Sequence, residues 1–338
     1  LPEIRNYKRT DYKGGTQNWN IDQDQNGNLY FANNNGLFQF DGSAWRKYPL
    51  PNSPDTRCVK IDSSGKIFIG GYSEFGYFKT NSKGKLEYVS LSKMVNKKKI
   101  IDFIWKIHLF KNEVIFQSFA RIYIYKNNKL KIVEAPNRFQ FSFQVKNHLY
   151  LQDISAGIVE YKNGKLYPVK GTTALNNTEI WGMFPLPENK LLIATLNKGL
   201  FVYNHEKAIP WDTEANTFIK KNSSLGGVTI KDKFIVLNSV LNGIIICDTN
   251  GKIIQHINHK KGLQNNTVLT SFLDNKNNLW LGLDNGIAFI NENSPFTYFG
   301  FSYDISTVYA SVVHKGNLYV ATNQGVFYHV WNTPFRED

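Results

Sequence analysis

The sequence predicts an all-β protein, specifically a β-propeller built from four-stranded antiparallel blades. Its apolar runs are short, rich in Ile, Val, Tyr and Phe, and bounded by turns of Gly, Asn and Lys, which is typical of strands. One strand–turn–strand–loop–strand motif recurs along the whole chain at intervals of about 40 to 45 residues, the length of one propeller blade. Many runs are apolar on both faces, as expected where neighbouring sheets cover both sides of each sheet.

The composition indicates a folded body that needs no disulfide or metal scaffold. The chain has 338 residues, of which 42% are hydrophobic and 14% aromatic. A chain of this length buries most of the surface that it exposes when unfolded, and its many aromatic residues exclude a disordered protein. Its longest apolar runs are too short to span a membrane. The two cysteines, Cys58 and Cys247, each lie in an apolar strand-like run, where we expect a buried, unreactive thiol.

The repeat contains eight motifs, and the first is the clearest. Its strands are expected at 19–21, 29–32 and 37–40, with a turn at Asp24–Gly27 and a fourth strand at 45–48. The eight motifs lie near 16–50, 55–91, 103–135, 138–170, 178–212, 223–258, 266–300 and 306–332. Further fourth strands are expected at 86–89, 129–132, 166–169 and 296–299. Only 91–103 tolerates a helix, and we interpret it as an insertion between blades.

The closure of the ring is ambiguous in the sequence. The eighth motif has no fourth strand of its own, whereas residues 4–8 look like a strand without a partner. Pairing the two would close eight blades into one domain over residues 1–338 and remove an open sheet edge. The alternative is seven complete blades, with the last motif beginning a second propeller. We expect the closed ring of eight.

Several motifs are more specific than a generic blade. Residues 24–37, which include Asp-Gln-Asn-Gly-Asn-Leu-Tyr-Phe-Ala-Asn and the following Gly-Leu, resemble the two-component regulator propeller repeat, D-x-x-G-x-L-W/Y-x-x-T/N-x-x-G-L. Residues 277–286 and 316–325 are similar, and residues 74–78 resemble the start of such sensors in Bacteroidetes, as do 6–7 with 17–19. The resemblance covers most of the chain and weakens in the third, fourth and sixth motifs, which lack the D-x-x-G turn.

In that family the propellers form the periplasmic sensor of hybrid histidine kinases or membrane-anchored transcription regulators. The resemblance therefore implies a periplasmic sensor module without catalysis or cofactor, in a full-length protein that acts as a homodimer. The chain starts at Leu1 without a signal sequence, so a secretory signal either has been removed or never existed, and the expectation of an exported protein comes from the resemblance. The membrane would be reached only through domains that this chain lacks. Whether the output is a kinase or a DNA-binding regulator stays open.

Loops that lead into the inner strands, and loops between second and third strands, share the face of a propeller on which ligands usually bind. Three Trp recur at one repeat position beside amides and charges, which is typical of a carbohydrate platform, because rings cover a sugar's apolar face while polar groups bond its hydroxyls. The candidate ligand-binding residues are Gln17, Asn18, Trp19, Arg57, Glu74, Trp105, Arg121, Gln140, Glu179, Trp181 and Asn266. For each Trp taken singly, the alternative to ligand contact is that it packs between blades.

A calcium site is a weak further hypothesis. Asp22, Asp24 and Asn26 copy the first half of an EF-hand loop. The twelfth position would be Asn33 rather than a bidentate Glu, and no helices flank the loop, so a β-turn explains the pattern better. We therefore expect no metal.

The formal charge of +13 suggests a polyanionic partner. The lysines are spread over turns in nearly every blade and no aromatic-basic RNA motif is present, so we expect no nucleic acid. The same charge would favour an anionic oligosaccharide over a neutral one by electrostatic steering.

The function we expect is the binding of an oligosaccharide, or of a partner propeller, on the loop face without catalysis. No nucleophile elbow, phosphate-binding loop or dinucleotide fingerprint is present. Two alternatives stay open. A carbohydrate-active hydrolase or lyase would need carboxylates that meet across blades, such as Glu179 with Asp153 or Glu74. A propeller used only for dimerisation would need no ligand site.

Overall fold

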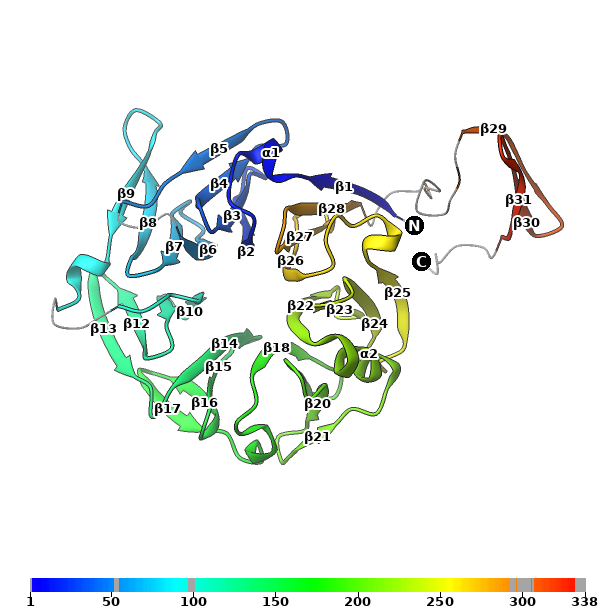
Figure 1. The fold of residues 1–338 in the computed structure, drawn as a ribbon. Coiled ribbons are helices and arrows are strands. Elements are labelled where there is room, and N and C mark those ends of the chain that lie inside the picture. The colour runs from blue at the N-terminus through cyan, green and yellow to red at the C-terminus, as the bar shows by residue number, and fades with distance from the viewer. Residues whose placement is uncertain are drawn as a thin grey trace.

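The computed structural model describes residues 2–51, 55–96, 101–291 and 307–331, together with Phe296 and Ile305. Seven four-stranded antiparallel sheets are arranged as blades around a central axis (Figure 1). Each blade runs from an inner strand at the axis to an outer strand at the rim, so the predicted propeller is confirmed.

The blades follow the chain in order. Blade 1 contains β2 (Asn18–Gln23), β3 (Leu29–Asn33), β4 (Gly36–Phe40) and β5 (Trp45–Tyr48). Blade 2 contains β6 (Thr56–Ile61), β7 (Ile67–Gly71), β8 (Phe75–Thr80) and β9 (Leu86–Ser90). Blade 3 contains β10 (Lys106–Phe110), β11 (Glu113–Gln117), β12 (Arg121–Lys126) and β13 (Lys129–Glu134). Blade 4 contains β14 (Phe139–Val145), β15 (His148–Asp153), β16 (Gly157–Lys162) and β17 (Lys165–Pro168).

The remaining blades complete the circle. Blade 5 contains β18 (Ile180–Pro185), β19 (Leu191–Thr195), β20 (Leu200–Tyr203) and β21 (Ala208–Pro210). Blade 6 contains β22 (Ser224–Ile230), β23 (Phe234–Ser239), β24 (Ile244–Asp248) and β25 (Ile253–Ile257). Blade 7 contains β26 (Val268–Leu273), β27 (Leu279–Leu283), β28 (Ile287–Asn291) and, from the other end of the chain, β1 (Glu3–Tyr7).

Strand β1 closes the ring at seven blades, so the expected ring of eight is wrong. It pairs antiparallel with β28, with Glu3 opposite Asn291 and Tyr7 opposite Ile287. The N-terminal strand thus completes the seventh motif and not the eighth, and blade 7 lies directly against blade 1. The physical reason is that β28 has an unpaired outer edge in blade 7, and β1 pairs with that edge next to blade 1. The outer strand expected at 296–299 lies outside the described residues except for Phe296.

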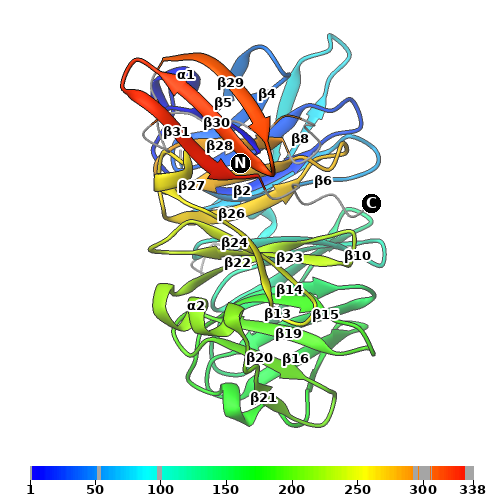
Figure 2. The same ribbon diagram turned by 90° about the vertical axis from the view of Figure 1, so that its right-hand side faces the viewer.

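The eighth motif forms a separate three-stranded sheet of β29 (Val308–His314), β30 (Asn317–Thr322) and β31 (Gly325–Val330). This sheet lies outside the ring (Figures 1 and 2). Many of its apolar side chains are open to solvent, with Tyr309 72% and Tyr328 71% exposed, although Val320 in its middle strand is buried. Seven complete blades followed by the last motif, as in the alternative, are therefore the arrangement found, whereas the second propeller of that alternative stays a prediction.

The predicted turns between the first two strands form through local side-chain chemistry. In blade 1 the Asp24 carboxylate accepts the backbone N–H groups of Asn26 and Asn28, each at 2.9 Å. Gly27 has φ +87°, a conformation that costs glycine little and other residues more. Asp62 and Asp274 repeat this pattern in blades 2 and 7. The Asp is therefore explained by the turn itself.

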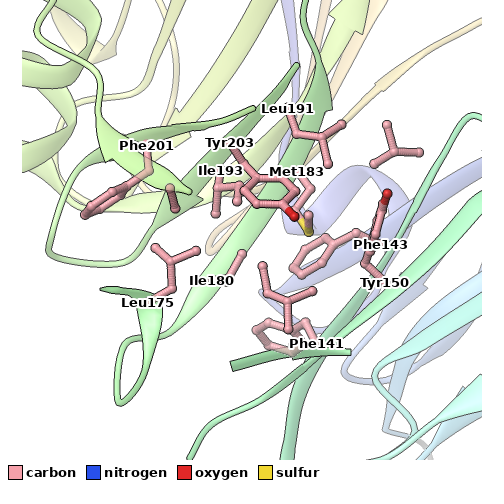
Figure 3. Packing of buried hydrophobic residues seen from close by; sticks show 13 residues of the cluster. Phe141, Phe143, Tyr150, Leu175, Ile180, Met183, Leu191, Ile193, Phe201 and Tyr203 are labelled. Carbon is pink, nitrogen blue, oxygen red and sulfur yellow. The ribbon is translucent and has the colours of Figure 1, made fainter. Parts of the chain in front are cut away.

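Packing between neighbouring blades forms the core, because each blade is covered on both faces. Figure 3 shows the cluster between blades 4 and 5, in which Phe141 and Phe143 face Ile180 and Met183. Ile193 in the same cluster has no exposed surface. Cys58 and Cys247 are both buried and free, as expected, and burial raises the pKa of Cys247 to about 12.

Among the residues that the structure describes, helices occur only between blades. The longest is α2 (Glu214–Asn222), which the sequence analysis did not predict and which fills the gap left between the fifth and sixth motifs. Thr213 caps it by accepting the Asn216 N–H, and Ala215 and Ile219 are buried against blades 5 and 6. The short elements are α1 (Arg9–Tyr12), η1 (Ser92–Met94), η2 (Thr173–Leu175) and η3 (His259–Lys261).

The expected helix-tolerant insertion at 91–103 contains η1, and its residues 97–100 lie outside the described residues. Within the described part of the chain, none of the helices has the length and apolar character needed to cross a bilayer.

Candidate functional site

A β-bulge near the start of the inner strands sets the direction of the candidate side chains. The register with the second strand shifts between Asn18 and Asn20 in β2, between Thr56 and Cys58 in β6, and at the same place in β14, β18, β22 and β26. The residues skipped by these shifts include Trp19, Arg57, Gln140, Phe141 and Trp181. A bulge re-aims its side chain relative to the regular pleat, and this explains why one repeat position carries such unusual residues.

Strand β10 has no shift in its described pairing, but Trp105 precedes it at the equivalent place. The backbone N–H of Trp105 donates to the carbonyl of Gln117 at 2.8 Å. The Trp residues that the sequence analysis aligned therefore occupy one structural position in blades 1, 3 and 5.

Six rings from blades 1, 3, 4 and 5 are in contact near the start of the inner strands, and we call this cluster the aromatic arc. Its members are Trp19, Phe103, Trp105, Phe119, Phe141 and Trp181. The centroids of Trp19 and Trp105 are 5.7 Å apart, and Phe119 stacks on Trp105 at 5.3 Å. Phe141 continues the arc, at 5.8 Å from Trp105 and 4.7 Å from Trp181. The three Trp thus pack on neighbouring rings and still remain half-buried.

Arg57 supplies a cation inside the aromatic arc. Its guanidinium carbon lies 4.7 Å from the ring centroid of Trp19, 4.9 Å from that of Phe103 and 5.6 Å from that of Trp105. Its Nη1 donates to Asp55 at 3.0 Å. Burial lowers the pKa of Arg57 and the Asp55 carboxylate opposes that shift. A guanidinium held between rings keeps its charge and offers planar donors.

Several donors of this cluster are buried without an acceptor among the described residues. They are Trp19 Nε1, Arg57 Nε and Trp105 Nε1. Trp181 differs, because its Nε1 donates to Glu179 Oε2 at 3.2 Å. Glu179 and Trp181, both predicted site residues, are therefore held together at one end of the arc.

Four other candidates have polar contacts within the ring. Asn18 is fully buried and donates to the Gly286 carbonyl at 2.9 Å. Gln17 donates to Asp284 at 2.8 Å, and Asn266 accepts the backbone N–H of His259 at 2.8 Å. Gln140 accepts through its backbone carbonyl from Gln117 at 3.1 Å. For Gln17, Asn18 and Asn266, the side chains themselves make bonds that join elements of the ring.

Glu74 and Arg121 lie apart from the arc and bond to outer strands. The Glu74 carboxylate, which is 1% exposed, accepts the hydroxyls of Tyr88 at 3.0 Å, Ser90 at 2.7 Å and Ser92 at 2.8 Å. Arg121 Nε donates to Glu134 on β13 at 2.9 Å. Turn chemistry did not explain these two residues, and in the structure both hold outer strands in place.

The carboxylates considered for catalysis each bond within their own surroundings. Burial alone would raise the pKa of Asp153, but hydrogen bonds from the backbone and amide of Asn137 and from the N–H groups of Ala156 and Ser155 outweigh it and lower that pKa. Glu179 is bonded to Trp181 and Glu74 to the blade 2 hydroxyls. None of the three contacts described here joins one of these carboxylates to another.

The calcium candidates also point to different partners. Asp22 pairs with Lys60 at 3.2 Å and accepts the Ile61 N–H at 2.8 Å, whereas Asp24 is occupied by its own turn. Asn26 uses its backbone N–H in that turn. Over the described ranges, no cluster of three or more His, Cys, Asp or Glu side chains could hold a metal ion.

A channel of about 500 Å³ runs along the axis between the inner strands. Lys60, Lys106, Lys146 and His108 line it, with Trp181 as its one link to the predicted site residues. Sequence reasoning missed these three lysines and this histidine. The signal was present in the alternation Lys106–Ile107–His108, in which polar residues interrupt an apolar inner strand at every second position.

Comparisons with known proteins agree on the fold. No protein-family model and no curated protein matches the chain. Among solved structures, the extracellular domain of a protein described as a hybrid two-component system of B. thetaiotaomicron is 18% identical with a TM-score of 0.70, over 97% of this chain and 46% of that one. Virginiamycin B lyase from Staphylococcus aureus is 14% identical with a TM-score of 0.66, over 86% of this chain and 99% of that one.

The WD40 propeller domain of Doa1 gives a TM-score of 0.66 at 12% identity, over 87% of this chain and 98% of that domain. The present chain therefore spans about half the length of the two-component extracellular domain that it matches. These similarities establish the fold as a β-propeller, and the extracellular domain is a structure of the kind that the sequence resemblance implies.

Proposed function

We propose that the chain is an exported ligand-sensing module of a signal-transduction protein, and that it binds an oligosaccharide on the aromatic arc without catalysing a reaction. The homodimer of the full-length protein and the periplasmic location expected from the resemblance belong to the same proposal. A ligand acts in such a module by favouring one arrangement of the receptor over another.

The observation that carries the proposal is how far the structural match extends. Residues 2–291, which contain the ring, are 290 of the 338 residues, or about 86%. The lyase match covers that same share, whereas the match to the two-component extracellular domain covers 97% of the chain. The longer match must include part of the sheet β29–β31, so it supports a sensor more strongly than a single-propeller enzyme.

The aromatic arc supports a sugar as the ligand. Half-buried rings of Trp19, Trp105 and Trp181 form a continuous band across several blades, with the Arg57 guanidinium and the Glu179 carboxylate among them. Such a band offers apolar faces for pyranose rings and charged groups for hydroxyls. The carboxylates considered for hydrolysis have structural partners, which favours binding over chemistry.

The proposal is tested by calorimetry on the whole chain after a glycan-array screen. We expect Trp181→Ala and Trp19→Ala each to weaken binding of the selected glycan at least tenfold, because each removes a stacking surface. Tyr167→Ala is the control, since Tyr167 is 47% exposed on the rim strand β17. An affinity for the glycan that stays unchanged in both Trp variants would overturn the proposal. So would the appearance of new reducing ends when the protein is incubated with the glycan, because that would show hydrolysis.

A further inference from the structure

The walls of the axial channel carry an excess of positive charge. Three lysines, Lys60, Lys106 and Lys146, line it, and its described lining contains no Asp or Glu. Lys60 has a counter-charge close behind the wall, because its Nζ lies 3.2 Å from the Asp22 carboxylate. The side-chain ammonium of Lys106 makes no ion pair or hydrogen bond with any residue that the structure describes, and its Nζ lies 5.4 Å from the ring centroid of Phe141.

Lys106 is therefore a half-buried ammonium whose nearest favourable contact is a ring face. Burial lowers its pKa, with only the Cys58 thiol opposing that shift. Removing a cation from water without a counter-ion is unfavourable, and a bound anion would relieve that cost.

Polar groups without partners line the opposite side of the channel. Asn238 on β23 is fully buried, and neither its amide nitrogen nor its amide oxygen has a partner among the described residues. Ser271 Oγ on β26 is likewise unpartnered. Both residues line the channel. Buried polar groups are nearly always bonded in native proteins, so these two indicate a ligand or water that completes their bonds.

Glycines line the channel on the side of blades 5 and 6, where close packing leaves no room for a Cβ. A Cβ at Gly182 would lie 2.6 Å from the Phe184 ring, and one at Gly227 would fall on the Val236 carbonyl. Close packing behind these inner strands thus excludes side chains at this wall. Asn238, on the second strand, lines the channel beside these glycines.

His108 is fixed as a neutral group beside the lysines. Ser142 Oγ donates to Gln117 Oε1 at 3.3 Å, so it accepts from His108 Nε2 at 2.8 Å. Burial, together with the charges of Lys106 and Lys60, lowers the pKa of His108 to about 3. Lys60 on β6 and Lys106 on β10 lie on neighbouring inner strands, and both line the channel on the wall formed by blades 2 and 3.

We infer that the axial channel is a binding site for a small oxyanion-bearing ligand, whose carboxylate or sulfate group is held by Lys106 and Lys60 and whose neutral part bonds to Asn238 and Ser271. This goes beyond the proposed function, because it names a second site, inside the ring, and stands whether or not the aromatic arc binds sugar. Paired lysines and amide donors are the groups that recognise oxyanions in proteins.

The test is calorimetry of the whole chain with sodium sulfate, sodium glucuronate and glucose, at an ionic strength held constant with sodium chloride. Concentrations up to roughly 10 mM cover a millimolar dissociation constant. We expect sulfate, glucuronate or both to bind, Lys106→Met to weaken binding about tenfold or more, and Lys106→Arg to retain it. Sulfate alone would indicate a free inorganic anion, and glucuronate an acidic sugar.

The matched control is Lys129→Met, which removes an exposed lysine of β13 at the same cost in net charge. If Lys106→Met does not fold, Asn238→Ala is used, with melting temperature in the presence and absence of the anion as the readout. Equal anion responses in wild type and Lys106→Met, equal losses in Lys129→Met, or no response to either anion would each overturn the inference. Binding of glucose alone would overturn it and leave the sensor proposal standing.

Discussion

Single buried carboxylates in this protein hold strands in place through hydroxyl groups. Glu74 accepts three O–H donors from the segment 88–92 while its side chain is almost completely buried. Burial and the neighbouring Glu74 charge both raise the pKa of Tyr88, so its hydroxyl stays a donor. Sequence reasoning predicted Glu74 as a ligand-binding residue because turn chemistry did not explain it. Its hydrogen-bond partners are 14 to 18 residues away in the chain, on β9 and η1.

We expect Glu74→Ala to lower the free energy of unfolding by about 3 kcal/mol, because it leaves three hydroxyls without their acceptor. Urea denaturation measures this change. The control is Glu87→Ala, which alters an exposed residue of β9, the strand that supplies Tyr88 and Ser90. It should change the free energy of unfolding by less than about 0.5 kcal/mol. An unchanged stability together with loss of ligand binding would show that Glu74 is a binding residue after all.

His108 makes stability depend on pH. Its folded pKa of about 3 lies below the unfolded value of about 6.5, so the unfolded chain binds its proton first. The stabilisation from neutral His108 is complete above about pH 6.5 and is lost progressively as the pH falls towards 3. From pH 6.5 to 5 the loss is about 2 kcal/mol.

Urea denaturation at both pH values measures this loss. In His108→Gln that part of the pH dependence should be absent, and a slope identical to that of the wild type would contradict the assignment.

Individual elements are well predicted where local chemistry decides them. The Asp24 turn and its copies at Asp62 and Asp274 form from side-chain hydrogen bonds within five residues, so the local sequence alone predicts their positions. Helix α2 has a capping Thr213, an acidic first turn at Glu214 and basic residues at its end, and these local signals were overlooked rather than absent.

The partner of β1 could not be read from local chemistry. Any strand edge can accept an apolar strand, and the sequence offered the eighth motif as readily as the seventh. Tyr7 makes the difference in the folded protein, since its ring is 7% exposed and stacks on Trp280 of blade 7 at 5.8 Å while meeting Phe40 of blade 1 at 5.3 Å. The closing strand is thus joined to both blades at the seam.

We expect Tyr7→Ala to destabilise the ring by about 3 kcal/mol, because it empties an aromatic site at the closure. Thermal unfolding followed by circular dichroism measures the change. Arg5, on the same strand, is exposed, so Arg5→Ala should cost less than about 1 kcal/mol. Equal effects of both substitutions would show that closure depends on backbone pairing and not on the aromatic seam.

At the scale of the whole molecule, the ring and the sheet β29–β31 differ in how far their side chains are buried. Blade 7 is buried on both faces, whereas all seven residues of β29 are exposed. The ring therefore carries the core, and the final sheet adds exposed apolar surface to the protein.

A chain ending at Asn291 should keep the melting temperature of the ring within a few degrees, because every strand of the seven blades lies before that end. It should also be more soluble, because exposed apolar sheet promotes association. Light scattering and thermal unfolding measure the two effects. A large loss of stability would mean that the final sheet supports the ring.

The sequence by itself determined the class of fold, the number of motifs, most strand positions, the turns and the one repeat position that carries the Trp residues. Each of these depends on residues within one motif, whose spacing and chemistry are visible locally. The tertiary structure alone decided the closure at seven blades, the insertion of Arg57 among the rings and the cationic channel. These features combine single residues from blades far apart in the chain, and only the circular packing of the blades sets which of those residues meet.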